Sequence, residues 1–156
     1  MVLSWSFFLI GGTWIKFEFD SPAPYNDRLN DEILRQLNPG NYTMSADCLF
    51  CKIIAGDIPS NKVFEDEDLF AFRDINPAAP VHILLIPKRH LSAIDKAVTA
   101  DELLLGKLLL RASIIARDEK LDEGFRLVIN TGKHSGRTIF HLHLHILGGR
   151  AMGPLG

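Results

Sequence analysis

Three histidines alternate with apolar residues near the C-terminus, in the run FHLHLHI that spans residues 140–146. Alternate side chains of a β-strand point to opposite faces, so we expect His141, His143 and His145 to share one face. A lone histidine such as His82 is most simply explained as a hydrogen-bonded, partly buried polar group. Core packing does not explain three titratable rings in one row. Neutral imidazole serves as nucleophile, general acid or base, and metal ligand. The pattern therefore indicates either a catalytic cluster or a metal site.

The two cysteines of the chain, Cys48 and Cys51, form a C-x-x-C pair. They lie too close together to join distant parts of a fold by a disulfide. We therefore expect a reduced, cytoplasmic setting in which the pair serves as free thiols or as metal ligands. By itself a C-x-x-C pair is weak evidence for a metal.

Length and charge limit the possible functions. The chain has 156 residues and a formal net charge of −2, so we expect one main domain without a basic face for a long nucleic acid. A local site can still bind a small phosphate-bearing ligand. No stretch approaches the roughly 20 apolar residues that cross a bilayer, so no membrane partner is expected. Nothing in the sequence calls for an organic cofactor.

The elements that would carry these residues follow from the apolar pattern. We expect a short helix at 48–55, capped by Asp47 and ended by Gly56, and a long helix from a Thr99–Glu102 capping box to about Lys120. Its apolar residues are expected to form one buried stripe: Leu103, Leu104, Leu108, Ile114 and Ile115. Strands are expected at 61–66, 69–74, 81–87, 124–130 and 139–147. Short links favour an α+β fold, an antiparallel sheet of about five strands with one long and one short helix.

The first 44 residues have a different character from the rest, which forms the domain at 45–156. Residues 1–19 are apolar but lack the basic segment of a secretory signal and the arginines of a transit peptide. A helix at 27–37, capped by Asn26, is expected within an otherwise poorly ordered segment. Because dense patterning begins after Met44, we hypothesise that Met44 is the natural start; a genuine, dispensable extension is the alternative.

Several motifs in order resemble the histidine triad (HIT) family. The triad run resembles the signature His-φ-His-φ-His-φ-φ, in which φ is apolar. Further similarity lies at 48–60 (CLFCKIIAGDIPS), 72–75 (FRDI), 82–90 (HILLIPKRH), 127–130 (LVIN) and 148–150 (GGR). The resemblance covers residues 46–152, and the GGR ending is similar to the histidine triad nucleotide-binding branch. It implies a HIT-like fold.

The resemblance implies hydrolysis of the P–N bond in purine nucleoside 5′-phosphoramidates, releasing a nucleoside monophosphate such as AMP and an amine. His143 would be the nucleophile that forms a nucleotidyl-histidine, with its inner nitrogen held by a backbone carbonyl of the facing strand. His145 would donate to a phosphate oxygen or to the leaving amine, and His82 would belong to the same network. A dinucleoside polyphosphate hydrolase and a regulatory nucleotide-binding module with weak catalysis are the alternatives.

The resemblance also implies which residues bind the nucleotide. Asp74 would accept from the ribose hydroxyls and Asn130 would contact the sugar–phosphate part. Gly136, Arg137 and Thr138 would bind the phosphate, with Thr138 also counted as catalytic, although a plain hairpin connection is the simpler interpretation of this loop. Thr138 stands where eukaryotic relatives usually have serine. The base would lie against Ile75, Phe50 and Phe72. For the two phenylalanines, a place in the ordinary hydrophobic core is nearly as good an explanation.

A structural zinc ion is implied by bacterial relatives, with the ligands Cys48, Cys51, His90 and His141. A full Cys2His2 shell would make the ion structural rather than catalytic. Buried thiols are the alternative. Relatives of this branch are symmetric dimers, so a homodimer is expected, with apolar surface on the long helix covering the partner.

Overall fold

The computed structural model describes residues 5–10, 13–18 and 45–154, and the chain divides into two units, 1–40 and 41–156. In the first unit, strands β1 (Trp5–Ile10) and β2 (Thr13–Glu18) pair antiparallel, with Ile10 opposite Thr13. The sequence analysis missed this hairpin, although consecutive glycines at 11 and 12 are a hairpin signal. The helix expected at 27–37 lies outside the described residues.

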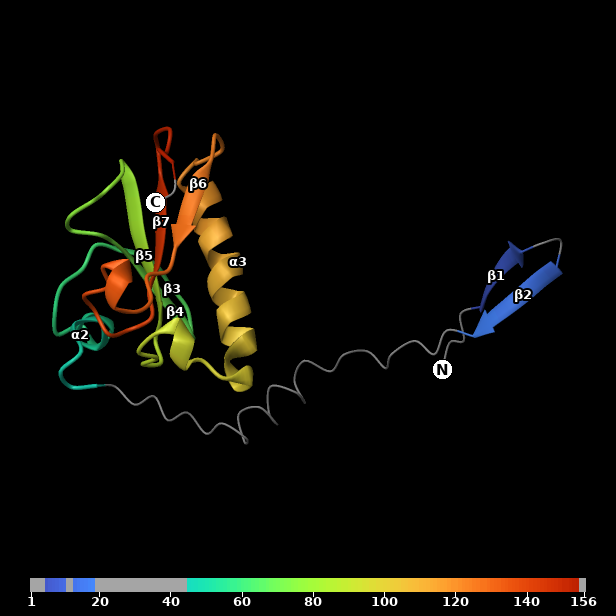
Figure 1. The fold of residues 1–156 in the computed structure, drawn as a ribbon, viewed down its shortest axis with the longest axis horizontal. Helices are drawn as coiled ribbons and strands as arrows, with labels where there is room; N and C mark the ends of the chain where they lie inside the picture. The colour runs from blue at the N-terminus through green and yellow to red at the C-terminus, as the bar shows by residue number, and fades with distance from the viewer. Residues whose placement is uncertain (1–4, 11–12, 19–44, 155–156) are drawn as a thin grey trace. The chain divides into compact units, whose positions relative to one another are not determined.

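The second unit is built on a five-stranded antiparallel sheet, which confirms the predicted α+β fold (Figure 1). In spatial order its strands are β3 (Lys62–Glu65), β4 (Leu69–Arg73), β5 (Val81–Pro87), β7 (Leu144–Gly148) and β6 (Phe125–Val128). Its helices are α2 (Leu49–Ala55), α3 (Glu102–Asp118) and the 3-10 turns Ile94–Lys96, Thr99–Asp101 and Lys133–Ser135. None of the described helices is long and apolar enough to span a bilayer.

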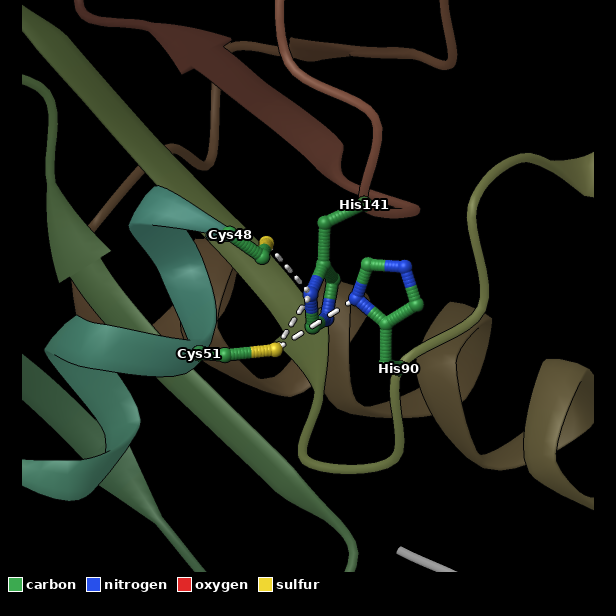
Figure 2. Close-up of side chains that lie close together, drawn as sticks. All are labelled: Cys48, Cys51, His90 and His141. Atoms are coloured by element: carbon green, nitrogen blue, oxygen red, sulfur yellow. Dashed lines mark hydrogen bonds between the residues drawn. The ribbon is translucent and has the colours of Figure 1, made fainter. Parts of the chain in front are cut away.

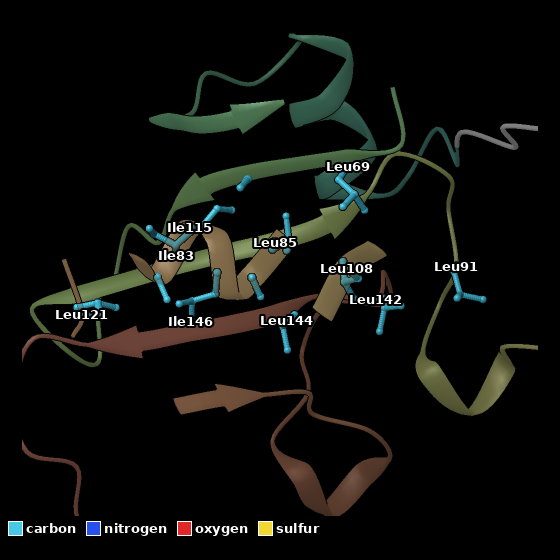
Figure 3. Packing of buried hydrophobic residues seen from close by; sticks show 13 residues of the cluster. Leu69, Ile83, Leu85, Leu91, Leu108, Ile115, Leu121, Leu142, Leu144 and Ile146 are labelled. Atoms are coloured by element: carbon cyan, nitrogen blue, oxygen red, sulfur yellow. The ribbon is translucent and has the colours of Figure 1, made fainter. Parts of the chain in front are cut away.

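Helix α3 covers one face of the sheet and forms the larger core with it (Figure 3). Leu108 and Ile115 of α3 meet alternate residues of the central strands, among them Ile83 and Leu144. Burying each such side chain stabilises the fold by about 2 kcal/mol. Leu103, predicted to be buried, is instead 56% exposed, because the face of α3 that meets the sheet is narrower than its apolar surface.

Helix α2 packs on the opposite face and forms the second core. The intervening residues of the same strands, such as Phe72 of β4 and Leu84 of β5, meet Phe50 of α2 there. Gly56 ends α2 at φ +85°, as predicted. Asp47 is not the cap that the sequence analysis expected, since the N-cap is Cys48 and no side chain caps this end.

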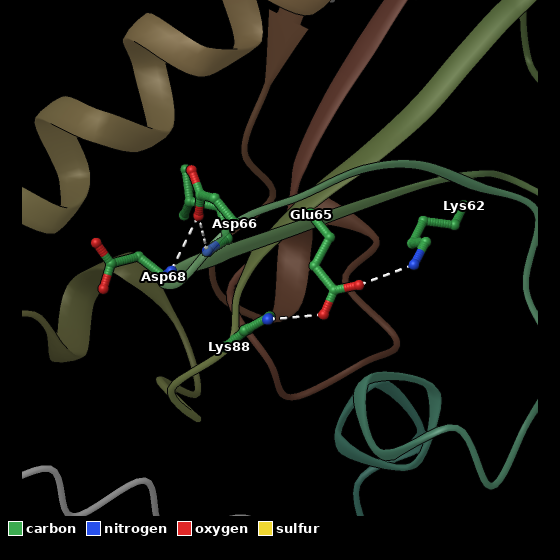
Figure 4. Close-up of polar contacts among 6 residues, drawn as sticks. Lys62, Glu65, Asp66, Asp68 and Lys88 are labelled. Carbon is green, nitrogen blue, oxygen red and sulfur yellow. Dashed lines mark hydrogen bonds and ion pairs between the residues drawn. The ribbon is translucent and has the colours of Figure 1, made fainter.

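The turn between β3 and β4 is stabilised by a carboxylate. Asp66 Oδ1 accepts hydrogen bonds from the backbone N–H groups of Asp68 and Leu69, at 2.9 and 2.8 Å (Figure 4). Beside the turn, Glu65 lies between Lys88 and Lys62, whose ammonium groups lower its pKa to about 2. The expected strands at 61–66 and 69–74 are thus joined by a tight turn, which brings β3 and β4 together as an antiparallel pair.

Two predicted details differ in the structure. The last strand begins at Leu144 rather than at residue 139, because the Leu142 N–H donates to Leu91 O outside the sheet. The predicted Thr99–Glu102 capping box is replaced by Asp101, whose carboxylate accepts from the Val98 backbone N–H at 3.0 Å.

Candidate active site

The three histidines of the triad all lie on the α2 side of the sheet, as their alternation predicted. Leu142, Leu144 and Ile146 belong to the core under α3, whereas the His141 and His143 rings contact Phe50 of α2, with ring centroids 5.9 and 5.4 Å away. Only His145 is in strand β7. The segment 139–143, which bends at Phe140 and His141, nevertheless keeps the alternation of its side chains, so the predicted shared face is correct.

His143 is oriented by its own segment of chain. Its Nδ1 lies 2.6 Å from the backbone carbonyl oxygen of His141, and a carbonyl oxygen only accepts, so Nδ1 carries the hydrogen. The lone pair of the neutral ring is then on Nε2. The sequence analysis expected a carbonyl of the facing strand; that prediction is wrong because residues 139–143 leave the sheet and turn one of their own carbonyls to the ring.

His145 and His82 form a hydrogen-bonded pair across β7 and β5. His82 Nε2 lies 2.9 Å from His145 Nδ1, and Asp74 Oδ2 lies 3.5 Å from His82 Nε2. Burial, reinforced by neighbouring His143 and His82, lowers the pKa of His145 to about 4. Burial also lowers the pKa of His82, with Asp74 opposing. Both rings are therefore neutral near pH 7.

The residues predicted to contact the nucleotide surround this pair unequally. Phe50 and Phe72 are 4% and 5% exposed and pack edge to face at 5.5 Å, so they belong to the second core as well as to the site. Ile75, next to Asp74, is 90% exposed. Asn130 comes two residues after Val128, which pairs with His145 across the strands. A strand alternation places Asn130 on the histidine face.

The loop 131–138 contains two glycines with positive φ. Gly132 and Gly136 have φ values of +81° and +76° around the turn Lys133–Ser135, and Thr138 is exposed beyond it. The Arg137 side chain already has partners within the protein, since its Nη1 donates to Ser92 O at 2.9 Å and its guanidinium stacks on Phe140 at 4.7 Å. The backbone of Arg137, rather than its side chain, is therefore available to bind a ligand.

Four residues converge at the other end of the triad (Figure 2). Cys48 and Cys51 come from α2 and its N-cap, His90 from the segment after β5, and His141 from the segment before β7. One ligand atom from each of the four lies within 4.8 Å of the others. His141 Nδ1 is 3.5 and 3.6 Å from the two sulfur atoms, and His90 Nδ1 is 3.4 Å from Cys51 Sγ.

These distances fit a tetrahedral metal ion. Zinc bonds of about 2.3 Å to sulfur and 2.0 Å to nitrogen place those ligand atoms about 3.5 Å apart. His141 Nε2 donates to Pro87 O at 2.8 Å, which leaves the lone pair on Nδ1, facing the sulfurs, and supplies the outer hydrogen bond usual for a metal-bound histidine. Burial lowers the pKa of His141 to about 4, so its ring is neutral, as a ligand must be.

A second group of metal-ligating residues among the described positions, Asp74, His82 and His145, fits a metal poorly. The 2.9 Å separation of His82 Nε2 and His145 Nδ1 is a hydrogen-bond distance, shorter than the roughly 3.3 Å between two nitrogens on tetrahedral zinc. The Ala78 N–H also donates to His82 Nδ1 at 3.1 Å, which forces the hydrogen of that ring onto Nε2. This group is a hydrogen-bond network.

Comparison with known proteins agrees with this geometry. The family model of the HIT domain matches residues 55–152. An uncharacterized HIT-like protein of Synechocystis sp. is 53% identical over 107 residues, which cover 69% of this chain and 94% of that protein. A 14 kDa zinc-binding protein of Brassica juncea is 49% identical over 108 residues, covering 68% and 96%. The chain belongs to the HIT family.

Solved structures share the fold. A HIT family hydrolase from Legionella pneumophila superposes with a TM-score of 0.68 at 48% identity, covering 69% of this chain and 96% of that one. A histidine triad nucleotide-binding protein from Candida albicans superposes with a TM-score of 0.60 at 30% identity, covering 70% and 85%.

Two groups near the site were not predicted from the sequence. The Ala78 amide that orients His82 is a main-chain group in a loop and leaves no sequence signal. Arg150 was noted only as part of the GGR motif, yet its Nη2 donates to Ala78 O at 3.1 Å.

Proposed function

We propose that this protein is a nucleotide hydrolase that cleaves the P–N bond of purine nucleoside 5′-phosphoramidates, releasing a nucleoside monophosphate and an amine. Membership of the HIT family supports the general class, since similar solved structures are named as a hydrolase and as a nucleotide-binding protein. The phosphoramidase activity and its place in the nucleotide-binding branch rest on the motif resemblance and on the chemistry of the site.

The observation that carries the proposal is the orientation of His143. Its Nδ1 donates to the His141 carbonyl, so its Nε2 lone pair is available to attack phosphorus. The ring is 7% exposed and lies edge to face against Phe50. A fixed imidazole with its lone pair on Nε2 is a good nucleophile, and it suits a two-step reaction because water can later cleave its bond to phosphorus.

The hydrolysis would take two steps. In the first, His143 Nε2 forms a bond to the α-phosphorus while the P–N bond breaks and its electron pair leaves on the amine nitrogen, which gains a proton. In the second, water attacks phosphorus and the bond to His143 breaks. Over both steps the one water consumed supplies a hydroxyl to the phosphorus and a proton to the amine.

His145 would bind the phosphate or the leaving nitrogen. Its Nε2 is buried and has no hydrogen-bond partner among the described residues. Leaving a buried polar atom unpaired costs about 1–3 kcal/mol, and a substrate oxygen or nitrogen would remove that cost. The backbone N–H groups of Gly136–Thr138, with the Thr138 hydroxyl, would add donors where charge develops on the phosphate.

The nucleoside would lie beside Asp74. Asp74 Oδ1 already accepts from the Asn76 N–H at 2.8 Å, and its remaining lone pairs would accept from the ribose hydroxyls. Asn130 would contact the sugar–phosphate part. The base would lie against Ile75 and the edges of Phe50 and Phe72, and the high exposure of Ile75 suits an apolar residue that a ligand covers.

We propose a structural zinc ion held by Cys48, Cys51, His90 and His141, supported by the donor set and by the name of the Brassica relative. A bound zinc would hold the segment whose carbonyl orients His143. We also propose a cytoplasmic homodimer joined partly through α3, where Leu103 and Leu110 are 56% and 66% exposed seven residues apart on one helix face. Sedimentation at twice the chain mass would support the dimer.

The test is to incubate the full-length protein with an adenosine 5′-phosphoramidate and, separately, with a diadenosine polyphosphate. We expect turnover of the phosphoramidate to be much faster and His143→Ala to reduce it by about a thousandfold or more. His134→Ala, an exposed loop histidine, is the matched control and should retain activity. Equal rates on both substrates, or turnover surviving in His143→Ala, would contradict the proposal.

A further inference from the structure

The GGR motif at 148–150 is explained by contacts in the structure rather than by the reaction. A side chain on Gly148 would meet Leu121 Cδ1 at 2.7 Å. Gly149 has φ +84°, and a Cβ there would lie 3.0 Å from Pro80 Cβ. The chain leaving β7 is therefore pressed against the loop 75–80, and this approach brings Arg150 to the loop.

The loop 75–80 is held at two points. At its start, the Asp74 N–H donates to His82 O at 3.0 Å, and Asp74 Oδ1 accepts from the Asn76 N–H. In its middle, Arg150 Nη2 donates to Ala78 O at 3.1 Å while Nη1 donates to Ala151 O at 3.0 Å. Arg150 thus contacts the carbonyl of the residue whose N–H faces His82.

Two groups determine which nitrogens carry hydrogen in the next two rings: the Ala78 N–H, and Asp74 Oδ2, which lies 3.5 Å from His82 Nε2 and also favours a hydrogen on that nitrogen. The Ala78 N–H donates to His82 Nδ1 at 3.1 Å, so the neutral His82 ring carries its hydrogen on Nε2. His82 Nε2 then donates to His145 Nδ1 at 2.9 Å. His145 is left with its hydrogen on Nε2, the atom that is buried and has no partner in the described part of the chain.

We propose that Arg150 is a positioning residue that, through the Ala78 amide, fixes the tautomers of His82 and His145 and makes His145 Nε2 a donor toward the reacting phosphate. The proposal rests on the proposed function for its last step only. If the Ala78 N–H moved away, His82 could carry its hydrogen on Nδ1. The His82–His145 bond would then reverse, and His145 would present a lone pair to the negatively charged phosphate.

The direct test is nitrogen-15 NMR of histidine-labelled full-length protein, which distinguishes the two tautomers of each ring without substrate. We expect Nε2–H forms of His82 and His145 in the wild type and mixed tautomers in Arg150→Ala. Arg150→Lys, which retains one donor, should restore the wild-type pattern in part. Arg126→Ala is the matched control, because Arg126 also donates to a carbonyl of the C-terminal tail, Gly153 O at 2.6 Å, away from the loop.

Kinetics on the adenosine phosphoramidate give the second readout. Arg150→Ala should lower kcat by about tenfold with little change in KM, because the lost donor acts on charge that develops in the transition state. Unchanged tautomers in Arg150→Ala, or an Nδ1–H form of His82 in the wild type, would overturn the inference while leaving the proposed function intact. If tautomers shift in Arg150→Ala but the wild type does not hydrolyse the phosphoramidate, the coupling stands and the proposed function fails.

Discussion

Three residues of one type occupy three different environments in the triad, and the hydrogen bond of each ring decides its chemistry. His141 donates from Nε2 and offers Nδ1 to the sulfurs. His143 donates from Nδ1 and offers Nε2. His145 accepts at Nδ1 and presents Nε2–H. In the proposed mechanism, two backbone carbonyls and one backbone amide would therefore make a metal ligand, a nucleophile and a donor of three identical side chains.

If His145 acts as a hydrogen-bond donor rather than by titrating, a neutral donor at the same position should substitute for it. We expect His145→Gln, whose amide nitrogen reaches the position of Nε2, to retain more phosphoramidate turnover than His145→Ala, by about tenfold. The measurement is kcat for both variants at pH 7. Equal kcat values in the two variants would show that the donor at this position does not contribute.

At this scale the sequence predicted more than the positions of the histidines. Strict alternation was enough to place all three on one face and the intervening leucines in the core. The tautomers could not be predicted, because they depend on groups such as the Ala78 amide, 67 residues before His145, that leave no trace in residue type. The partner of His143 was mispredicted for the same reason.

At the scale of elements, segment 139–143 is the part that differs most from its predicted form. A strand there would have satisfied its backbone by pairing with β6. Instead Leu142 N–H bonds to Leu91 O, and the His141 side chain bonds to Pro87 O. The segment is thereby fixed to the end of β5 and to the chain that follows it, which also carries His90. Long-range contacts of this kind end the strand pairing although the side chains still alternate, and sequence periodicity does not record such contacts.

A bound zinc ion would join α2, the chain after β5 and the segment before β7. We expect removal of zinc by a chelator, or Cys48→Ser, to lower the thermal midpoint by roughly 10 °C, because metal binding contributes directly to folding stability. Asp57→Ser, an exposed change just beyond α2, should not alter the midpoint. A metal analysis that finds active protein without zinc, or a chelator without effect on the midpoint, would contradict the zinc proposal.

At the scale of the whole molecule, the two faces of the sheet carry different kinds of residues. The face under α3 carries the larger apolar core, with residues such as Ile83 and Ile146 fully buried. The other face carries α2, the second core and nearly all the polar groups of the site. The domain can therefore hold neutral, buried histidines on one face because the other supplies enough apolar burial to offset their cost.

That cost makes the stability of the fold depend on pH. The pKa of His145 is about 4 in the folded chain and 6.5 when unperturbed. Between these values the unfolded chain binds more protons, so the free energy of unfolding falls as pH decreases from 6.5 to 4 and is fully retained above 6.5. The contribution of His145 is at most about 3 kcal/mol, and burial of His82 and His141 acts in the same direction.

Urea unfolding at pH 7, 6, 5 and 4.5, at fixed ionic strength and with the same zinc content, measures this dependence. The wild type should lose stability steeply below pH 6.5, and His145→Gln should lose less over the same range because glutamine does not titrate. His134→Gln, at a ring exposed to water in the folded chain, should follow the wild type. Parallel curves for wild type and His145→Gln would show that the pKa of His145 is the same in the folded and unfolded chains, and the predicted cost of burying this ring would then be wrong.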